Sequence, residues 1–133
     1  MTSTIVSTRI ELDDVMESAQ GGDAKYVILA VGKSNRFSGR DDVESVFYET
    51  YADLAPGVLE NIEKDSRDRF RIAGVSIMHR FGKIPVGEIT YAIAVSALRH
   101  EDAFQACRFM VDGLNSDLPV WKYEMPERDK SKT

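Results

Sequence analysis

Basic side chains that could bind an anion gather at a few places in a sequence whose net charge is −5. Lys33, Arg36 and Arg40 lie within eight residues that contain no acid. Arg99 and His100 stand where an alternating, strand-like segment gives way to a helical one, and the free N–H groups at the start of a helix attract anions. The pattern indicates an anion site. The plainer alternatives are a solvated basic loop and ordinary polarity at the start of a helix.

Lys122 is a candidate for a reactive group, because it lies between two aromatic residues, Trp121 and Tyr123. Side chains alternate between the two faces of a strand, so Lys122 faces a cleft if both rings face the core. Desolvation and nearby arginines would lower the pKa of its amine and make it a usable acid, base or nucleophile. The simpler alternative is a side chain that extends through apolar surroundings to water.

Metal and cofactor chemistry have little support in the residue types present. The chain contains one cysteine, Cys107, and two histidines, His79 and His100, which are too few for a disulfide framework or a usual zinc site. There is no phosphate-binding glycine loop and no nucleophile elbow. His79 and Arg80 end a predicted strand before a glycine turn, where we expect them to cap the strand or pair with carboxylates. We therefore expect neither a metal nor a cofactor.

The composition is that of an ordinary globular protein. A length of 133 residues, with 43% hydrophobic and 29% charged positions, suits one domain, which we place at residues 1–124, followed by a polar C-terminal tail at 125–133. The negative net charge argues against a nucleic-acid partner. No apolar stretch is long enough to span a membrane. Because no secretory signal is visible, the cytoplasm is the expected compartment.

Hydrophobic periodicity predicts the order β-α-β-β-α-β-β-α-β. Strands are expected at 3–10, 25–32, 43–51, 72–80, 88–97 and 119–124, and helices at 12–20, 52–70 and 101–114. The apolar run 25–32 is typical of a strand buried on both faces, and 81–87 reads as a turn. The inner faces of the two longer helices are expected to include Leu54 and Phe104. Adjacent strands without an intervening helix favour antiparallel pairing and an α+β fold.

Four segments carry motifs of one known family. They are VESVFYETYADLA at 43–55, HRFGKIPVGE at 79–88, EDAF at 101–104 and LPVWKYE at 118–124. In order and spacing they resemble the large, catalytic subunit of molybdopterin synthase, the MoaE family, over about three quarters of the chain. The resemblance implies a MoaE-like α/β hammerhead, an α+β fold with a mostly antiparallel sheet and two main amphipathic helices.

The same resemblance implies a sulfurtransferase of molybdenum cofactor biosynthesis. Such a subunit binds cyclic pyranopterin monophosphate. A small ubiquitin-like, MoaD-like subunit inserts its C-terminal Gly-Gly thiocarboxylate, and its sulfur passes to the pterin. The large subunit is expected as a homodimer flanked by two small subunits. Phosphate and thiocarboxylate both need positively charged hosts, which suits the basic clusters.

On matching positions the resemblance assigns the catalytic role to Lys122. Seven further residues are expected to bind substrate, largely because of their charge and position. They are Arg36, Arg40, Arg99, His100, Asn115, Tyr123 and Glu124. Arg99 and a base of the 33–40 loop are expected to converge on one anion. Asn115 stands where the family usually has a second lysine, and Arg99–His100 reverse the family's order.

Two alternatives to an active enzyme remain open at this level. Asn115 favours a catalytically weak or inactive homologue that acts as a binding or regulatory subunit, because an amide supplies neither a cation nor a base. The other alternative is an unrelated α+β module that binds a small ligand.

Overall fold

The computed structural model describes residues 3–126 of the chain. Within that range the elements are β1 (Ser3–Val6), α1 (Leu12–Ser18), β2 (Tyr26–Lys33), β3 (Val43–Glu49), α2 (Ala55–Arg69), β4 (Gly74–Arg80), β5 (Gly82–Pro85), β6 (Ile89–Ala97), α3 (His100–Asp117) and β7 (Trp121–Pro126). Apart from β5, every element lies where the hydrophobic pattern predicts one.

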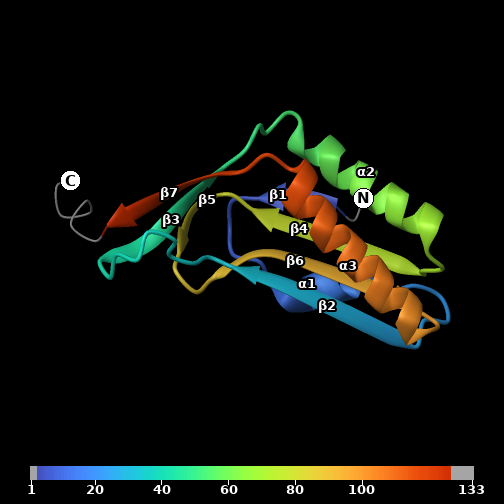
Figure 1. Cartoon of the computed structure of the whole chain (residues 1–133). Coiled ribbons are helices and arrows are strands. Elements are labelled where there is room, and N and C mark those ends of the chain that lie inside the picture. Colours follow the sequence, from blue (N-terminus) through green and yellow to red (C-terminus); the bar gives the residue numbers. More distant parts are fainter. Residues whose placement is uncertain (1–2, 127–133) are drawn as a thin grey trace.

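The strands form two sheets. The larger has the order β1-β4-β6-β2 and the smaller has the order β5-β3-β7. Pairing is antiparallel except between β1 and β4. Figure 1 shows α2 and α3 over one face of the larger sheet, α1 on the opposite face, and the smaller sheet extending from one end. The α+β fold, the mostly antiparallel pairing and the two main helices are confirmed.

The main core lies between the larger sheet and the helices α2 and α3. Leu59 of α2 and Met110 of α3 are fully buried against Ile77 of β4 and Ile93 of β6. Each such side chain stabilises the fold by about 1.5–3 kcal/mol through burial. The other face of β6 presents alanines to the short helix α1. The strand β6 is therefore covered on both faces.

Segment 81–87 was expected to be a turn, and that prediction is wrong. Gly82–Pro85 form β5, which pairs with β3, and Ile84 is fully buried there. Gly82 has a φ of 102° and Gly87 a φ of 94°, a left-handed backbone that glycine adopts without strain. Gly82 and Gly87, which suggest a turn in the sequence, lie at two bends of the chain. At these bends the chain leaves the larger sheet, adds β5 to the smaller sheet and returns to the larger one.

Other sequence predictions also need correction. The strand β2 is not buried on both faces, because it is the last strand of its sheet, and Val27 and Val31 are 40% and 38% exposed. Leu54 precedes α2 and Phe104 lies on the outer side of α3, so both are exposed instead of in the core. Residues 125 and 126 pair with β3 in β7, so the strand expected at 119–124 extends two residues further. The rest of the expected tail, 127–133, lies outside the described residues.

Membrane-spanning helices and metal-binding clusters are both absent from residues 3–126. In that part of the chain no helix is long and apolar enough to cross a membrane. No three His, Cys, Asp or Glu side chains of the same range are grouped so that they could hold a metal ion.

Candidate active site

A cavity of about 380 Å³ lies where the two sheets meet. Its walls come from β2, β3, β4, β6, the C-terminal end of α3 and β7, and they include Lys33, His79, Tyr91, Asn115 and Lys122. A neighbouring cavity of about 430 Å³ shares both lysines and adds Arg36. The fold thus gathers two ammonium groups and a guanidinium around one hollow.

Lys122 lies in the wall of both cavities. In the ladder between β3 and β7 it stands opposite Tyr48, and its Nζ lies 5.8 Å from the centroid of the Tyr48 ring, within reach of a cation–π contact. Trp121 and Tyr123 are 40% and 51% exposed. Lys122 thus lines a cavity although Trp121 and Tyr123 do not face the core, so the condition on which the sequence prediction depends is not met. The rings are partly exposed because β7 is an edge strand of the smaller sheet.

Asn115 also lines the cavity, from the last turns of α3. Its Nδ2 donates a hydrogen bond to the carbonyl oxygen of Val111 at 3.0 Å. The structure thus places Asn115 and Lys122, which are seven residues apart in sequence, on the walls of one cavity.

An irregularity in the sheet brings Lys33 to the same place. The register of β2 against β6 shifts between Gly32, which pairs with Tyr91, and Lys33, which pairs with Ile89. Such a bulge redirects a side chain, and bulges are frequent beside active sites. Thr90, the residue that the shift skips, lines the cavity too. A sequence pattern of period two carries no sign of this shift, so Lys33 was recognised as basic and not as a cavity residue.

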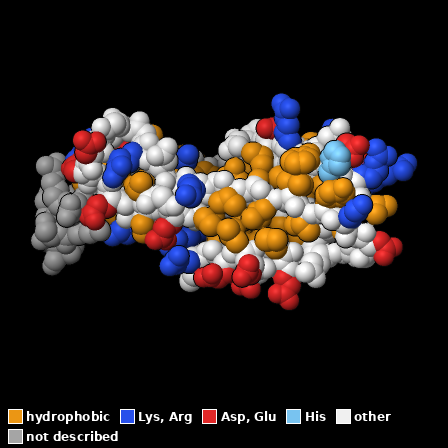
Figure 2. Space-filling model, turned by 90° about the horizontal axis from the view of Figure 1, so that it is seen from below, with side chains coloured by type: hydrophobic (Ala, Val, Ile, Leu, Met, Phe, Trp, Pro, Cys, Tyr) orange, Lys and Arg blue, Asp and Glu red, His pale blue; other side chains and the backbone are white. Residues whose placement is uncertain are grey.

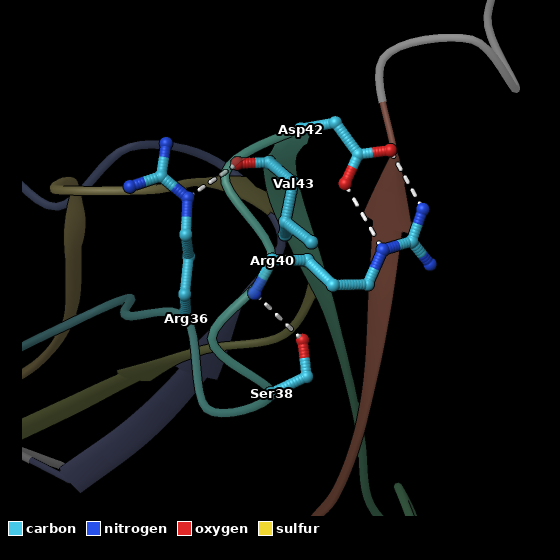
Figure 3. A network of polar contacts seen from close by, with 5 residues as sticks. All are labelled: Arg36, Ser38, Arg40, Asp42 and Val43. Atoms are coloured by element: carbon cyan, nitrogen blue, oxygen red, sulfur yellow. Dashed lines mark hydrogen bonds and ion pairs between the residues drawn. The ribbon is translucent and has the colours of Figure 1, made fainter.

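The two arginines of the basic loop between β2 and β3 point to different sides of the loop (Figure 3). Arg36 extends to one side, where its Nε donates to the carbonyl oxygen of Val43 at 2.9 Å. Arg40 points to the other side and pairs with Asp42 through contacts of 2.6 and 3.0 Å. Arg36 borders the second cavity, whereas Arg40 is held away by a carboxylate on its own loop.

Glu124 and Tyr123 are engaged in holding the fold together. Glu124 Oε2 accepts hydrogen bonds from the backbone N–H groups of Phe37 and Ser38 at 2.8 and 3.1 Å. Bonds from Ser38 and Phe37 keep the pKa of Glu124 below its usual value. The Tyr123 hydroxyl donates to Glu49 at 3.4 Å. The structure therefore gives Glu124 a loop-positioning role, fastening the basic loop to β7.

Arg99 and His100 lie at the far end of the larger sheet. The pairing of β2 with β6 runs from Tyr26 beside Ala97 to Lys33 beside Ile89, so a full strand length separates them from the cavity. Both contact Glu101, Arg99 at 3.2 Å and His100 at 3.6 Å. The prediction that Arg99 and the 33–40 loop converge on one anion is therefore wrong within one chain. Arg99 and His100 lie at the other end of the sheet, where Glu101 in the first turn of α3 pairs with both.

His79, which the sequence analysis expects only to cap a strand or pair with a carboxylate, also lines the cavity. It is only 6% exposed, and its ring stacks on Phe81 with centroids 4.4 Å apart and planes 7° apart. Nδ1 lies 3.1 Å from the carbonyl oxygen of Arg80. Burial, and to a lesser degree the charge of Lys122, lowers the pKa of His79 to about 4. Arg80 pairs with Glu88 at 2.8 Å, as expected for this strand end.

The low pKa of His79 predicts a specific loss of stability in acid. The unfolded chain protonates this histidine below pH 6.5 and the folded chain only near pH 4, so stability is lost as the pH falls through that window. The contribution is about 3 kcal/mol. We measure the free energy of unfolding in urea at pH 7 and at pH 4. Between these two pH values it should fall by about 3 kcal/mol more in the wild type than in His79→Gln. Equal losses in the two proteins would contradict the burial of a neutral imidazole.

The comparison with known proteins gives one consistent family. A family model described as MoaE protein matches residues 5–117. The molybdopterin synthase catalytic subunit of Pyrococcus abyssi is 35% identical over 113 residues, 85% of this chain and 74% of that protein. The corresponding subunit of Arabidopsis thaliana is 36% identical over 89 residues, 67% of this chain and 44% of that protein. The chain thus spans about three quarters of the first relative and less than half of the second.

Solved structures agree with the sequence matches. The molybdopterin synthase structure from Staphylococcus aureus superposes with a TM-score of 0.85 at 25% identity, over 92% of this chain and 90% of that one. A chain from the complex of subunits 1 and 2 of the Helicobacter pylori molybdopterin-converting factor shares the fold, with a TM-score of 0.75 at 12% identity over 96% of this chain and 86% of that one. The resemblance drawn from four sequence motifs is confirmed: the chain belongs to the MoaE protein family.

Proposed function

We propose that this protein is a molybdopterin synthase catalytic subunit. In this proposal it transfers sulfur from the C-terminal thiocarboxylate of a small ubiquitin-like subunit to cyclic pyranopterin monophosphate. The observation that carries the proposal is the cavity between the two sheets, whose walls include Lys33, Lys122 and Asn115. Two ammonium groups in one partly enclosed hollow suit a substrate phosphate and an incoming thiocarboxylate.

Lys122 is the group that we assign to the chemistry. It lines both cavities, so it borders the space for the pterin as well as the side that is open to Arg36. As an ammonium, Lys122 can bind the thiocarboxylate and act as an acid. After it loses its proton, the amine can act as a base or as a nucleophile toward the pterin intermediate. Lys33 and Arg36 supply further positive charge around the same hollow.

The test is a conversion assay with the purified protein. It is mixed with cyclic pyranopterin monophosphate and a small subunit that ends in a Gly-Gly thiocarboxylate, and the molybdopterin formed per minute is measured. The same small subunit with an ordinary carboxylate is the control, because it has no sulfur to give. We expect product only with the thiocarboxylate. No product with any small subunit of this type would overturn the proposal.

Asn115 supports a second candidate function. The cavity has an amide where the family usually has a lysine, and an amide cannot act as a base. A catalytically weak or inactive homologue would keep the fold and bind the small subunit without converting the pterin. Binding of the thiocarboxylated subunit in the absence of product would favour this candidate.

We further propose that the protein forms a homodimer through the open edge of β2. Apolar side chains surround this edge, and we call them the β2 surface: Tyr26, Val27, Val31, Leu98 and Phe104, all between 36% and 63% exposed. The face turned toward the viewer in Figure 2 carries a broad group of hydrophobic side chains with few charges inside it. Contiguous apolar patches of this kind mark interaction sites, and an open strand edge can pair with a second copy.

A two-fold pairing at this edge would also give Arg99 and His100 a place in the reaction. In a symmetric antiparallel pair, the Tyr26 end of one β2 lies beside the Lys33 end of the other. His100 contacts Tyr26, with ring centroids 5.5 Å apart. The dimer would therefore bring Arg99 and His100 of one protomer toward the cavity of its partner, where they would bind the anion that they cannot reach within one chain.

The dimer predicts a mass of twice 14.9 kDa in sedimentation at micromolar concentration. Val31→Glu would place a charge on the β2 surface, and we expect it to shift the mass to that of one chain because a buried unpaired carboxylate is costly. Lys64→Glu is the matched control, because the Lys64 side chain on α2 is exposed. This variant should leave the dimer intact. A wild-type mass of 14.9 kDa at every concentration would refute the dimer.

A further inference from the structure

The cavity between the two sheets is lined by both charged and uncharged polar side chains. Lys33 and Lys122 are the charged ones, and the proposed sulfur transfer uses them. His79 and Tyr91 line the same cavity and have no part in that proposal, with Asn115 next to Tyr91. Their two rings are neighbours, with centroids 5.7 Å apart. A pair of uncharged polar groups in a half-enclosed hollow is suited to reading the hydrogen-bonding pattern of a ligand.

The proton of His79 is fixed by its neighbour. A carbonyl oxygen only accepts hydrogen bonds, so the contact of 3.1 Å to the Arg80 carbonyl requires a proton on Nδ1. In a neutral imidazole the other nitrogen, Nε2, then carries the lone pair. Stacking on Phe81 holds the plane of the ring. Because burial lowers the pKa of His79 to about 4, Nε2 is an acceptor throughout the physiological range.

Tyr91 is the matching donor. Its ring lies close to the backbone of Gly32, and burial raises the pKa of Tyr91, so the phenol keeps its proton. The side chain of Asn115 acts in the opposite direction and lowers that pKa. The Asn115 amide nitrogen donates to the Val111 carbonyl oxygen. Tyr91 thus has a phenol proton that it can donate to a ligand in the cavity.

We propose that His79 and Tyr91 together bind the cyclic amide edge of a nitrogen heterocycle. The ring N–H of the ligand donates to Nε2 of His79, and the adjacent ring carbonyl accepts from the Tyr91 hydroxyl. This inference rests on the proposed function, since the pyrimidinone ring of a pterin has this N–H and C=O side by side. With the ring held there, Lys33 and Lys122 remain for its anionic parts.

The arrangement of His79 and Tyr91 predicts that the protein discriminates between two simple pteridines. Pterin (2-amino-4-oxopteridine) has an N–H beside a carbonyl. In 2,4-diaminopteridine the same two positions are an acceptor and an amino donor, so both hydrogen bonds are reversed. A buried polar group left without its partner costs enough to lower affinity about tenfold or more. We expect the wild type to bind pterin at least tenfold more tightly than 2,4-diaminopteridine in calorimetric titrations at pH 7.5.

Tyr91→Phe removes only the hydroxyl, and we expect it to abolish this preference while the affinity for 2,4-diaminopteridine stays the same or rises. His79→Gln keeps an acceptor and should retain part of the preference, whereas His79→Leu should lose it. Tyr51→Phe is the matched control: Tyr51 is exposed and packs on Trp121 outside the cavity. Circular dichroism confirms that each variant is folded.

Equal affinity of the wild type for the two rings, or an unchanged preference in Tyr91→Phe, would overturn the inference. Its failure is separable from failure of the proposed function, because ring binding requires neither sulfur nor a small subunit. Conversion activity without ring preference removes the inference alone. Ring preference without conversion activity removes the proposed sulfur transfer and leaves the binding site.

Discussion

Replacing Lys122 by alanine should lower the rate of molybdopterin formation by about a hundredfold to ten-thousandfold, the usual value of one acid–base group. Lys122 lines both cavities at the junction of the sheets. Its side chain is exposed on an edge strand and is no part of the hydrophobic core, so the variant should fold with the stability of the wild type. The measurement is molybdopterin formed per minute with a thiocarboxylated small subunit.

Two companion variants show what the lysine does. Lys122→Arg keeps the positive charge but cannot give up a proton at neutral pH, so it should bind the small subunit and still convert the pterin slowly. Lys83→Ala removes an exposed lysine of β5 in the same sheet, away from both cavities, and should be as active as the wild type. Equal rates for the wild type and Lys122→Ala would remove Lys122 from the chemistry.

Most of the fold follows from local patterns in the sequence. The alternation in 88–97 and the four-residue spacing of apolar positions in 52–70 each predict an element that the structure contains. The predictions that failed have one physical origin. They depend on which other element of the fold each segment pairs with. Nothing local tells that Gly82–Pro85 pair with β3, or that β2 is an edge strand, because both properties depend on segments far away in the chain.

The candidate site shows the same limit. Lys122 and Asn115 could be selected because a family resemblance supplies their positions, and the structure places both on one cavity. Charge alone was a weaker guide. Arg40 and Arg99 have nearby acids, Asp42 and Glu101, that pair with them. The sequence does not mark His79 and Tyr91 as cavity residues, because burial, a backbone carbonyl and a sheet bulge define their surroundings, and none of these is visible as a motif.

Gly32→Ala is expected to lower kcat/KM about a hundredfold, the effect of misplacing a positioning group by about 1 Å. A Cβ added at Gly32 would lie 2.3 Å from Cε2 of Tyr91 and 2.6 Å from its Cδ2, closer than two carbons can approach. The backbone of β2 is held by its pairing with β6, so the Tyr91 ring must move, and it lines the cavity. The same assay of molybdopterin formation measures the loss.

A double variant separates this clash from a general loss of stability. In Tyr91→Leu the ring is absent, so adding Gly32→Ala to that variant should cost little further activity, and the two changes should be far from additive. Gly57→Ala is the matched control, since a Cβ at Gly57 meets nothing within 4 Å and alanine favours the helix α2 around it. Additive losses from Gly32→Ala and Tyr91→Leu would show that Gly32 acts through the strand itself. Strongly non-additive losses would identify the clash between a side chain at position 32 and the Tyr91 ring as the cause of the lost activity.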